Sequence, residues 1–331
     1  MVGGIRGSYS MTKGESCSIL LATCNGAAYL PALLSSFNAQ TCRPGRLVLR
    51  DDGSEDATLD MLRKYRAACP DLVTIIEDNC GRLGTAGNFT NLLGHADSNY
   101  ILFCDQDDVW LPGKIEKTLS VMAAAEDRYG SDTPLLVHSD LSVVDRDLQP
   151  IAPSFWKYQK LNPQVGISLN RLLPQNAVTG CTVMINRPLA RLAAPIPRDA
   201  IMHDWWLALV AATFGKIVYL DEPTVLYRQH GGNSIGAKRW GFRRILAQAQ
   251  STQEVRASML RTMKQAQALL DRYRDHMTPS QIKLVESYAH LPYMSKIERV
   301  KTMFKYRFFK HGTIRTIGFL ANLLALDQAA S

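Results

Sequence analysis

The sequence predicts an α/β fold: a mixed, mostly parallel central sheet with helices on both faces, followed by a helical extension. Three observations lead to this prediction. Short apolar runs alternate with amphipathic stretches from Cys17 onward, carboxylates cluster directly after two of these runs, and beyond Gly236 long helical patterns replace the alternation. We therefore expect a flexible extension over 1–15, an α/β domain over 16–237 and a helical, basic region over 238–331.

The composition is that of a folded globular protein. The chain has 331 residues, of which 46% are hydrophobic and 21% charged. Its Gly- and Ser-rich start contains no apolar run, which favours a flexible extension over a signal peptide. The seven cysteines form no CxxC pair, so neither a disulfide framework nor a zinc site is indicated, and we expect a cytoplasmic location.

Units of a strand followed by a helix open the α/β domain. The predicted strands and the helical patterns after them are 18–23 with 29–39, 46–50 with 56–67, 73–77 with 87–96, and 100–104 with 112–127. Apolar runs at 135–138, 181–185 and 217–220 should complete the sheet and build one side of a cleft. Because ligands of such sheets bind beyond the carboxyl ends of the strands, we expect the functional residues there.

The C-terminal region is predicted to be helical over 242–275 and 280–290. Thr278 is placed as the N-cap of the second helix, with Pro279 at its first position and Gln281 completing a capping box. The apolar stretch 316–326 has about eleven residues, well short of the roughly 20 that span a bilayer. We therefore expect no membrane-spanning segment.

Three carboxylates directly follow the predicted strand 100–104, at Asp105, Asp107 and Asp108. Like charges at this spacing repel each other unless a cation neutralises them. Oxygen ligands suit Mg²⁺ or Mn²⁺, which complete their shell with water and phosphate oxygens, so a diphosphate substrate is indicated. The alternative is an acidic turn that caps the helix beginning near Pro112.

A second acidic cluster, over 51–56, follows the predicted strand 46–50, and Asp56 is placed as N-cap of the next helix. Two such clusters at neighbouring strand ends would face one crevice; the alternative is ordinary turn chemistry around Asp52-Gly53. The glycines 81, 84 and 87 do not form a dinucleotide-binding fingerprint, because no strand directly precedes them and no acidic partner follows in register.

The ordered motifs of the chain resemble those of family 2 glycosyltransferases, which have the GT-A fold. The motifs are Thr-x-Asn-Gly (23–26), Arg-Asp-Asp-Gly-Ser-x-Asp (50–56), Asp-Gln-Asp-Asp-Val-Trp-x-Pro-x-Lys (105–114), Val-Thr-Gly (178–180), His-Asp-Trp-Trp (203–206) and Tyr-Arg-Gln-His (227–230). Within the family, the chain is most similar to bacterial rhamnosyltransferases that build cell-wall polysaccharides and O-antigens. The likeness covers roughly residues 16–310.

The resemblance implies a set of donor-binding residues. Thr23, Asn25 and Asp52 would line the nucleoside pocket, with Asp52 accepting from the pyrimidine N3–H. Asp105 would bind the ribose or support the metal through water. Asp107 would be the principal ligand of Mg²⁺ or Mn²⁺, which stabilises charge on the leaving nucleoside diphosphate.

The resemblance also implies the residues that handle the diphosphate and close the metal site. Arg228 and His230, in a loop with Gly231 and Gly232, would fold over the donor diphosphate. His230 is in addition a candidate metal ligand. Relatives tend to carry polar residues where this chain has the two glycines, so the mobility of the loop is the feature that departs from the family pattern.

On the acceptor side, Asp204 matches the catalytic base that removes the proton from the acceptor hydroxyl, so a single displacement inverts the anomeric carbon. Trp205, Trp206 and Trp110 would contact acceptor sugars. From the residues alone, Asp204 could equally cap a helix, and at least one of Trp205 and Trp206 could be a core residue. For Trp110, the alternative is a helix start.

The basic residues are concentrated at the end of the chain. Residues 238–331 hold 17 Lys and Arg against 6 Asp and Glu, out of totals of 38 and 30. The segment 296–315 mixes basic and aromatic residues, which fits a helix lying at the inner face of the cytoplasmic membrane. The alternative is a helix that packs on the catalytic domain or on a second subunit, as in a homodimer.

The expected reaction is transfer of L-rhamnose from dTDP-L-rhamnose, plausibly in α-1,3 linkage, to a lipid-linked surface polysaccharide. A UDP-hexose donor is the alternative within the class. Nucleic-acid binding by the basic region is a remote alternative, because no known binding motif occurs and the acidic strand ends would repel phosphates.

Overall fold

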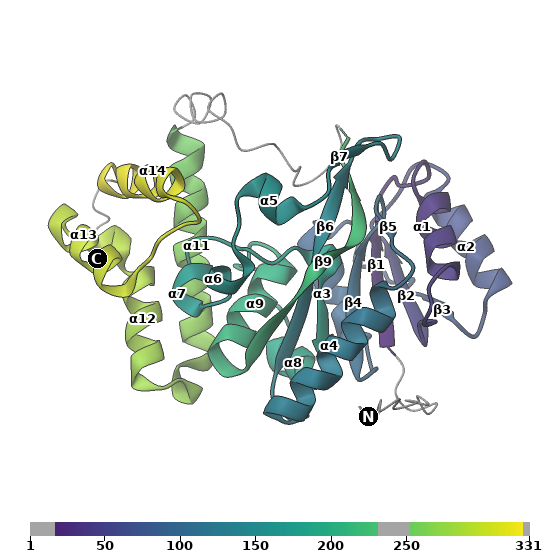
Figure 1. Cartoon of the computed structure of the whole chain (residues 1–331), viewed down its shortest axis with the longest axis horizontal. Helices are drawn as coiled ribbons and strands as arrows, with labels where there is room; N and C mark the ends of the chain where they lie inside the picture. Colours follow the sequence, from purple (N-terminus) through teal and green to yellow (C-terminus); the bar gives the residue numbers. More distant parts are fainter. Residues whose placement is uncertain (1–16, 231–251, 327–331) are drawn as a thin grey trace, which may run out of the picture.

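The computed structural model describes residues 17–230 and 252–326, which form a sheet flanked by helices and a bundle of C-terminal helices on one side of it (Figure 1). The predicted extension 1–15, the glycine loop at 231–232 and the first part of the helical pattern 242–275 lie outside these ranges. Within the described residues, no helix is long and apolar enough to cross a membrane.

The sheet is mixed, as predicted. Its parallel half runs in the order β3 (Val73–Ile75), β2 (Arg46–Asp51), β1 (Cys17–Thr23) and β4 (Tyr100–Asp105). The order continues with β8 (Met184–Asn186), β6 (Leu135–Val144), β9 (Lys216–Arg228) and β5 (Val109–Trp110), while β7 (Pro150–Ala152) pairs with β6. In this second half only β6 and β9 are parallel to each other.

Helices cover both faces of the sheet because successive strand residues point to opposite sides. On one face Leu20, Val48 and Phe103 belong to a hydrophobic cluster with α3 (Gly84–Gly94), α8 (Arg187–Ala193) and α9 (His203–Phe214). On the other face Leu21, Leu49 and Cys104 belong to a cluster with α1 (Leu30–Asn38), α2 (Thr58–Ala68) and α4 (Lys114–Tyr129).

The C-terminal helices are α11 (Thr252–Tyr273), α12 (Pro279–Ala289), α13 (Lys296–Tyr306) and α14 (Thr313–Leu324). The predicted capping box of α12 is confirmed: Thr278 and Gln281 each accept from the other's backbone amide. The side chain of Gln281 also donates to the carbonyl of Thr213 at 2.6 Å, and the hydroxyl of Tyr273 donates to the carbonyl of Leu192 at 2.7 Å. These bonds join the helical region to α9 and α8, whose hydrophobic cluster it shares.

The predicted basic helix over 296–315 is interrupted. Arg307 adopts a left-handed conformation with φ of 57°, which ends α13, and α14 begins six residues later. Arg299 does not face solvent. It is 1% exposed and donates to four carbonyl oxygens, those of Leu291, Pro292, Leu323 and Leu326. This arginine therefore ties α13 to the end of α14.

Candidate active site

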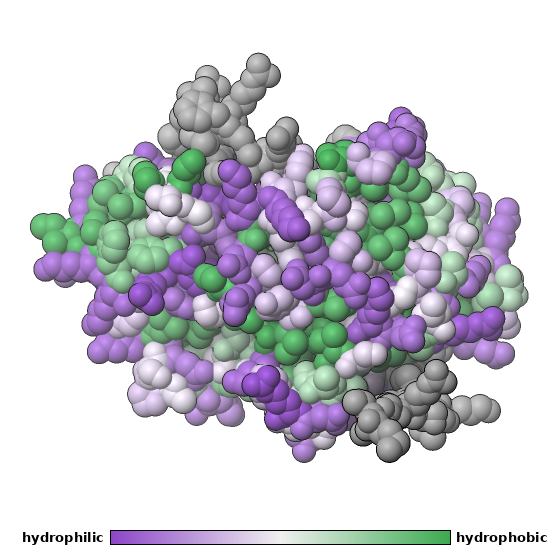
Figure 2. Space-filling view, viewed as in Figure 1, coloured by the Kyte–Doolittle hydropathy of each residue, from purple (hydrophilic) through white to green (hydrophobic). Residues whose placement is uncertain are grey.

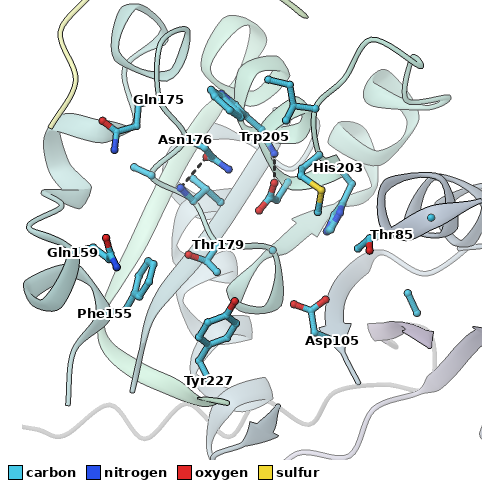
Figure 3. A pocket seen from close by; sticks show the side chains of 18 of the residues that line it. Thr85, Asp105, Phe155, Gln159, Gln175, Asn176, Thr179, His203, Trp205 and Tyr227 are labelled. Atoms are coloured by element: carbon cyan, nitrogen blue, oxygen red, sulfur yellow. Dashed lines mark hydrogen bonds between the residues drawn. The ribbon is translucent and has the colours of Figure 1, made fainter. Parts of the chain in front are cut away.

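A cavity of about 700 Å³ opens beyond the carboxyl ends of β1, β2 and β4, where the sequence predicts it. Asp52, Asp105 and Asp107 line it from the sheet, and Asp204 lines it from the first turn of α9. Figure 3 shows Asp105 and Thr85 on one side of this space and the amides of Gln159 and Gln175 on the opposite side. The site thus lies between the sheet and the elements that follow β6.

Asp52 is held by the start of α3. Its Oδ1 accepts from the amide of Leu83 at 2.7 Å and from the guanidinium of Arg50 at 2.9 Å, while its Oδ2 accepts from the amide of Gly84 at 2.8 Å. Helix α3 has no side-chain cap of its own, so Asp52 satisfies amides that would otherwise lack partners. The φ of 69° at Gly84 favours glycine at this close approach. The carboxylate is fixed in position with Oδ2 still able to accept a second bond.

The three carboxylates after β4 diverge. Asp105 and Asp107 line the cavity, whereas Asp108 is fully buried, and its Oδ1 accepts from the amide of Arg228 at 3.3 Å. Burial raises the pKa of Asp105 to about 7, and the charges of Asp107 and Asp204 add to the effect. A divalent cation beside Asp105 and Asp107 would relieve this repulsion, so the two residues fit a metal site.

A second potential ligand group lies deeper. Ligand atoms of Asp105, Asp108 and Cys181 lie within 4.8 Å of one another. Burial raises the pKa values of the Asp108 carboxyl and the Cys181 thiol well above their ordinary range. Two neutral groups, one of them a sulfur, are poor ligands for Mg²⁺. The cavity-facing carboxylates are therefore the better metal site.

His230 and Arg228 serve Asp107 in different ways. The Nε2 of His230 lies 2.8 Å from Oδ2 of Asp107, and both residues line the cavity. The guanidinium of Arg228 lies behind them: it is 5% exposed and donates to the backbone carbonyls of Asp107 at 2.8 Å and Arg146 at 2.5 Å. The ring of Tyr29 stacks on His230 and contacts Arg228. Arg228 therefore holds the loop that carries Asp107.

Asp204 lies in the first turn of α9, opposite the strand ends. Its Oδ1 accepts from the amide of Trp205 at 2.6 Å, and the amide of Gly180 is a further donor to the carboxylate. A Cβ at Gly180 would lie 2.9 Å from the ring of His203 and 3.4 Å from Oδ2 of Asp204, so this approach requires a glycine. Burial raises the pKa of Asp204 to about 7 despite these bonds. A carboxyl tuned to neutral pH suits proton transfer.

Comparison with known proteins shows which family the first half of the chain matches. Residues 18–164, which contain both acidic strand ends, match the sequence profile of glycosyl transferase family 2. This segment is therefore similar to family 2 glycosyltransferases. The chain is 28% identical to the dTDP-rhamnosyl transferase RfbG of Shigella flexneri over 229 residues, which cover 66% of this chain and 74% of that protein.

A second curated relative and a solved structure extend the comparison. The chain is 28% identical over 173 residues to the UDP-Glc:alpha-D-GlcNAc-diphosphoundecaprenol beta-1,3-glucosyltransferase WfgD of Escherichia coli, covering 52% of this chain and 60% of that protein. The mannosyltransferase PcManGT of Pyrobaculum calidifontis, solved with GDP-Man and Mn²⁺, superposes with a TM-score of 0.50 at 17% identity, over 94% of this chain and 80% of that one. The glycosyltransferase therefore has the predicted GT-A fold.

The cavity brings together most of the side chains that the sequence places at the active site. They are Thr23, Asp52, Asp105, Asp107, Asp204, Trp205 and His230. The exception on the nucleoside side is Asn25, which is exposed, does not line the cavity, and whose Oδ1 accepts from the amide of Glu55 at 2.8 Å. The sequence predicts that Asn25 contacts the donor, but in the structure this residue joins two loops.

Three further predictions need correction. Trp110 is 2% exposed, packs edge-on against Phe37 and does not line the cavity, so it is a core residue and not an acceptor contact. Trp206 is fully buried and donates to the carbonyl of Ala193, which leaves Trp205 as the tryptophan that faces the cavity. The sequence predicts that Arg228 is a loop residue that contacts the diphosphate. In the structure Arg228 ends strand β9, and its guanidinium contacts backbone carbonyls.

Two further residues, for which the sequence predicts no role, support the site. Gln106 bonds the amide and the carbonyl of Cys24 through its side chain, both at 2.8 Å, and so joins the β1 and β4 loops. Lys114 is not a solvated surface lysine: it is fully buried and donates to the carbonyl of Cys181 at 3.0 Å. No local pattern distinguishes these side chains from surface ones, because their partners lie 82 and 67 residues away.

The raised pKa of Asp204 predicts a stability change that depends on pH. The unfolded chain releases this proton near the ordinary value of 3.8 and the folded chain near 7, so stability is lost as pH rises through this window. Asp204→Asn should therefore stabilise the fold by up to about 4 kcal/mol above pH 7 and little at pH 4. Thermal unfolding from pH 4 to 8 measures this difference, with the exposed Asp199→Asn as control. A difference that does not change with pH would contradict the burial of an ionisable Asp204.

Proposed function

We propose that the protein is an inverting, metal-dependent glycosyltransferase that moves L-rhamnose from dTDP-L-rhamnose to a lipid-linked surface polysaccharide. The observation that carries the proposal is that one cavity is lined by Asp105 and Asp107 from the sheet and by Asp204 from α9. Two of them suit a metal-bound diphosphate, and the third suits a base acting from the other side of the sugar. The similarity to a dTDP-rhamnosyl transferase supports the choice of donor.

The donor would bind along the sheet edge. Thr23 and Asp52 lie at the ends of neighbouring strands, and the second acceptor position of Asp52 Oδ2 suits the N3–H of a thymine or uracil. Asp107, with His230 beside it, would hold Mg²⁺ or Mn²⁺, and Asp105 would support the ion or the ribose. When bound, the metal would stabilise negative charge on the leaving nucleoside diphosphate.

Asp204 would act on the acceptor. Its carboxylate, held by the amides of Trp205 and Gly180, would take the proton from the attacking hydroxyl. The indole of Trp205 donates to the carbonyl of Leu172 at 2.7 Å, which fixes the ring at the cavity wall where a sugar could pack on it. Attack from the side opposite the diphosphate inverts the anomeric centre.

A UDP-hexose is the second candidate donor. The similarity to the glucosyltransferase WfgD, whose name gives UDP-Glc as its donor, favours it over other nucleotides. The contact proposed for Asp52 does not discriminate, because thymine and uracil both offer N3–H. A direct comparison of donors is therefore needed.

A thermal-shift panel tests the donor. In Mn²⁺, dTDP-rhamnose should raise the unfolding temperature more than UDP-glucose, since a ligand at 100 times its Kd stabilises by about 2.7 kcal/mol. EDTA or Asp107→Ala should remove most of the shift, while Asp71→Asn, an exposed control, should retain it. A larger shift with UDP-glucose would make UDP-glucose the proposed donor. A shift of the same size in EDTA would contradict metal-dependent donor binding.

A pH-rate profile tests the base. With a pKa of about 7, Asp204 is ionised above that pH, so kcat should fall about tenfold for each unit below it. Asp204→Asn should reduce turnover by at least about a thousandfold and leave the donor-induced thermal shift intact. Asp199→Asn serves as the control. Substantial turnover in Asp204→Asn would exclude the proposed base.

The C-terminal helices support contact with an anionic membrane surface. Ile297 and Phe304 on α13 and Ile314 and Ile317 on α14 are 50–69% exposed. Exposed lysines, Lys296, Lys301 and Lys305, lie along α13. Figure 2 shows hydrophobic surface over this end of the molecule. Apolar side chains with interspersed lysines are complementary to an anionic bilayer, where the lipid-linked acceptor would be anchored.

Vesicle co-flotation tests this contact. The wild-type chain should bind vesicles that contain 30% phosphatidylglycerol better than neutral phosphatidylcholine vesicles. Ile297→Ser with Phe304→Ser should weaken binding at least about tenfold, since each side chain contributes roughly 1.5–3 kcal/mol when fully buried. Ile151→Ser, an exposed isoleucine on β7, is the control. Equal binding of the wild type and the double variant would contradict the contact.

A further inference from the structure

The two ends of the cavity differ in charge. At the sheet end the carboxylates of Asp52, Asp105 and Asp107 line it. At the other end it is lined by Lys310, which lies between α13 and α14, and by Arg315 in the first turn of α14. Gln159 and Gln175 mark this second end, opposite Asp105 in Figure 3. A ligand that spans the cavity therefore meets acidic groups on one side and basic groups on the other.

Hydrogen bonds hold the basic end of the cavity in place. Arg315 donates through Nη2 to the carbonyl of Gln159 at 2.6 Å, and the amide of His311 donates to the side chain of Gln175 at 2.9 Å. The ring of His311 accepts from the amide of Asn162 at 3.1 Å. These bonds join residues more than 130 positions apart in the sequence. The segment 310–315 is therefore positioned by the end of α5 (Phe155–Gln159), by the loop before α6 (Pro163–Gly166) and by the loop after α7 (Leu169–Leu172).

The charges at the basic end influence the pKa values of Lys310 and His311. Burial, together with the smaller effect of the nearby charge of Arg315, lowers the pKa of Lys310 to about 8. Burial also lowers the pKa of His311 to about 4, with Arg171 and Arg315 contributing, so this histidine is neutral at pH 7 and adds no charge. Lysine and arginine charges that are held together in a partly buried wall would be stabilised by an anion between them.

We propose that the Lys310–Arg315 end of the cavity binds a phosphate group of the acceptor. The inference rests on the proposed function, because it assumes that the donor diphosphate occupies the acidic end through a metal. Asp204 and Trp205 line the same cavity, so an acceptor whose hydroxyl reaches Asp204 would extend from there toward Lys310. The shared chemistry is a phosphate, either the diphosphate of a lipid carrier or a phosphate within the glycan.

The surroundings of the basic end favour a lipid carrier. Arg315 lies in the first turn of α14, and the exposed Ile314 and Ile317 lie on the same helix, so an alkyl chain that leaves the cavity across α14 would meet apolar side chains. The ammonium of Lys310 also lies 5.4 Å from the ring of Phe319 on the same helix. A diphosphate that carries a chain therefore has contacts available for both of its parts.

Calorimetric titration tests the proposal with two probes, farnesyl diphosphate and inorganic pyrophosphate, in the presence of EDTA so that no metal occupies the acidic end. The wild-type chain should bind farnesyl diphosphate, and Lys310→Met should raise its Kd at least tenfold. Lys310→Met keeps an apolar stem against Phe319, and Lys310→Arg should restore binding because it restores the charge. Farnesol measures binding to the apolar surface alone, and Lys283→Met, which removes an exposed lysine of α12, is the matched control for loss of a positive charge.

The outcomes separate the two sources of phosphate and the two proposals. Lys310-dependent binding that is much tighter for farnesyl diphosphate than for pyrophosphate supports a lipid carrier, and equal Lys310-dependent binding of both supports a phosphate within the glycan. Two results would overturn this inference alone, provided that the chain binds dTDP with Mn²⁺. One is that the wild type binds neither probe, and the other is that Lys310→Met binds both probes as tightly as the wild type does. A chain that binds no nucleotide with Mn²⁺ overturns the proposed function instead.

Discussion

The site depends on holding carboxylates close together at one edge of a parallel sheet. The register places Asp51 beside Thr23 and Asp105 beside Ala22, so the ends of β1, β2 and β4 coincide in space. Repulsion and burial oppose this arrangement, as the raised pKa of Asp105 indicates. The fold offsets the cost locally: the α3 amides and Arg50 bind Asp52, and the ring of His230 meets Asp107. A bound cation would offset the remainder.

The loops at this edge are connected to one another. Gln106 bonds the backbone of Cys24, Asn25 bonds Glu55, and Arg228 holds the carbonyl of Asp107. Each bond links loops that follow different strands. Residues that the family resemblance places on the donor, Asn25 and Arg228, thus support the residues that face it. Such support matters because a displaced ligand or base would lose the geometry on which transfer depends.

The C-terminal helices complete the cavity and are not only an appendage to the α/β domain. Met259 and Thr262 of α11, together with Lys310 and Arg315, line it from the side opposite the sheet. The same helices share the hydrophobic cluster of α8 and α9, and Arg299 ties α13 and α14 together. The side of the cavity opposite the sheet is therefore built largely from residues that come after the segment matched by the family profile.

The sequence alone determined what local patterns encode. The four strands of the parallel half, β1 to β4, were predicted to within two residues at each end because apolar periodicity and turn residues act over short distances. The capping box at Thr278 is likewise a local, four-residue pattern. The carboxylates at the strand ends followed from the same reasoning. Only the tertiary structure decided which tryptophan faces the cavity, which basic side chains are buried, as Lys114 and Arg299 are, and which line the cavity. Burial of these side chains depends on segments distant in sequence that pack against them, and a local sequence pattern does not identify such partners.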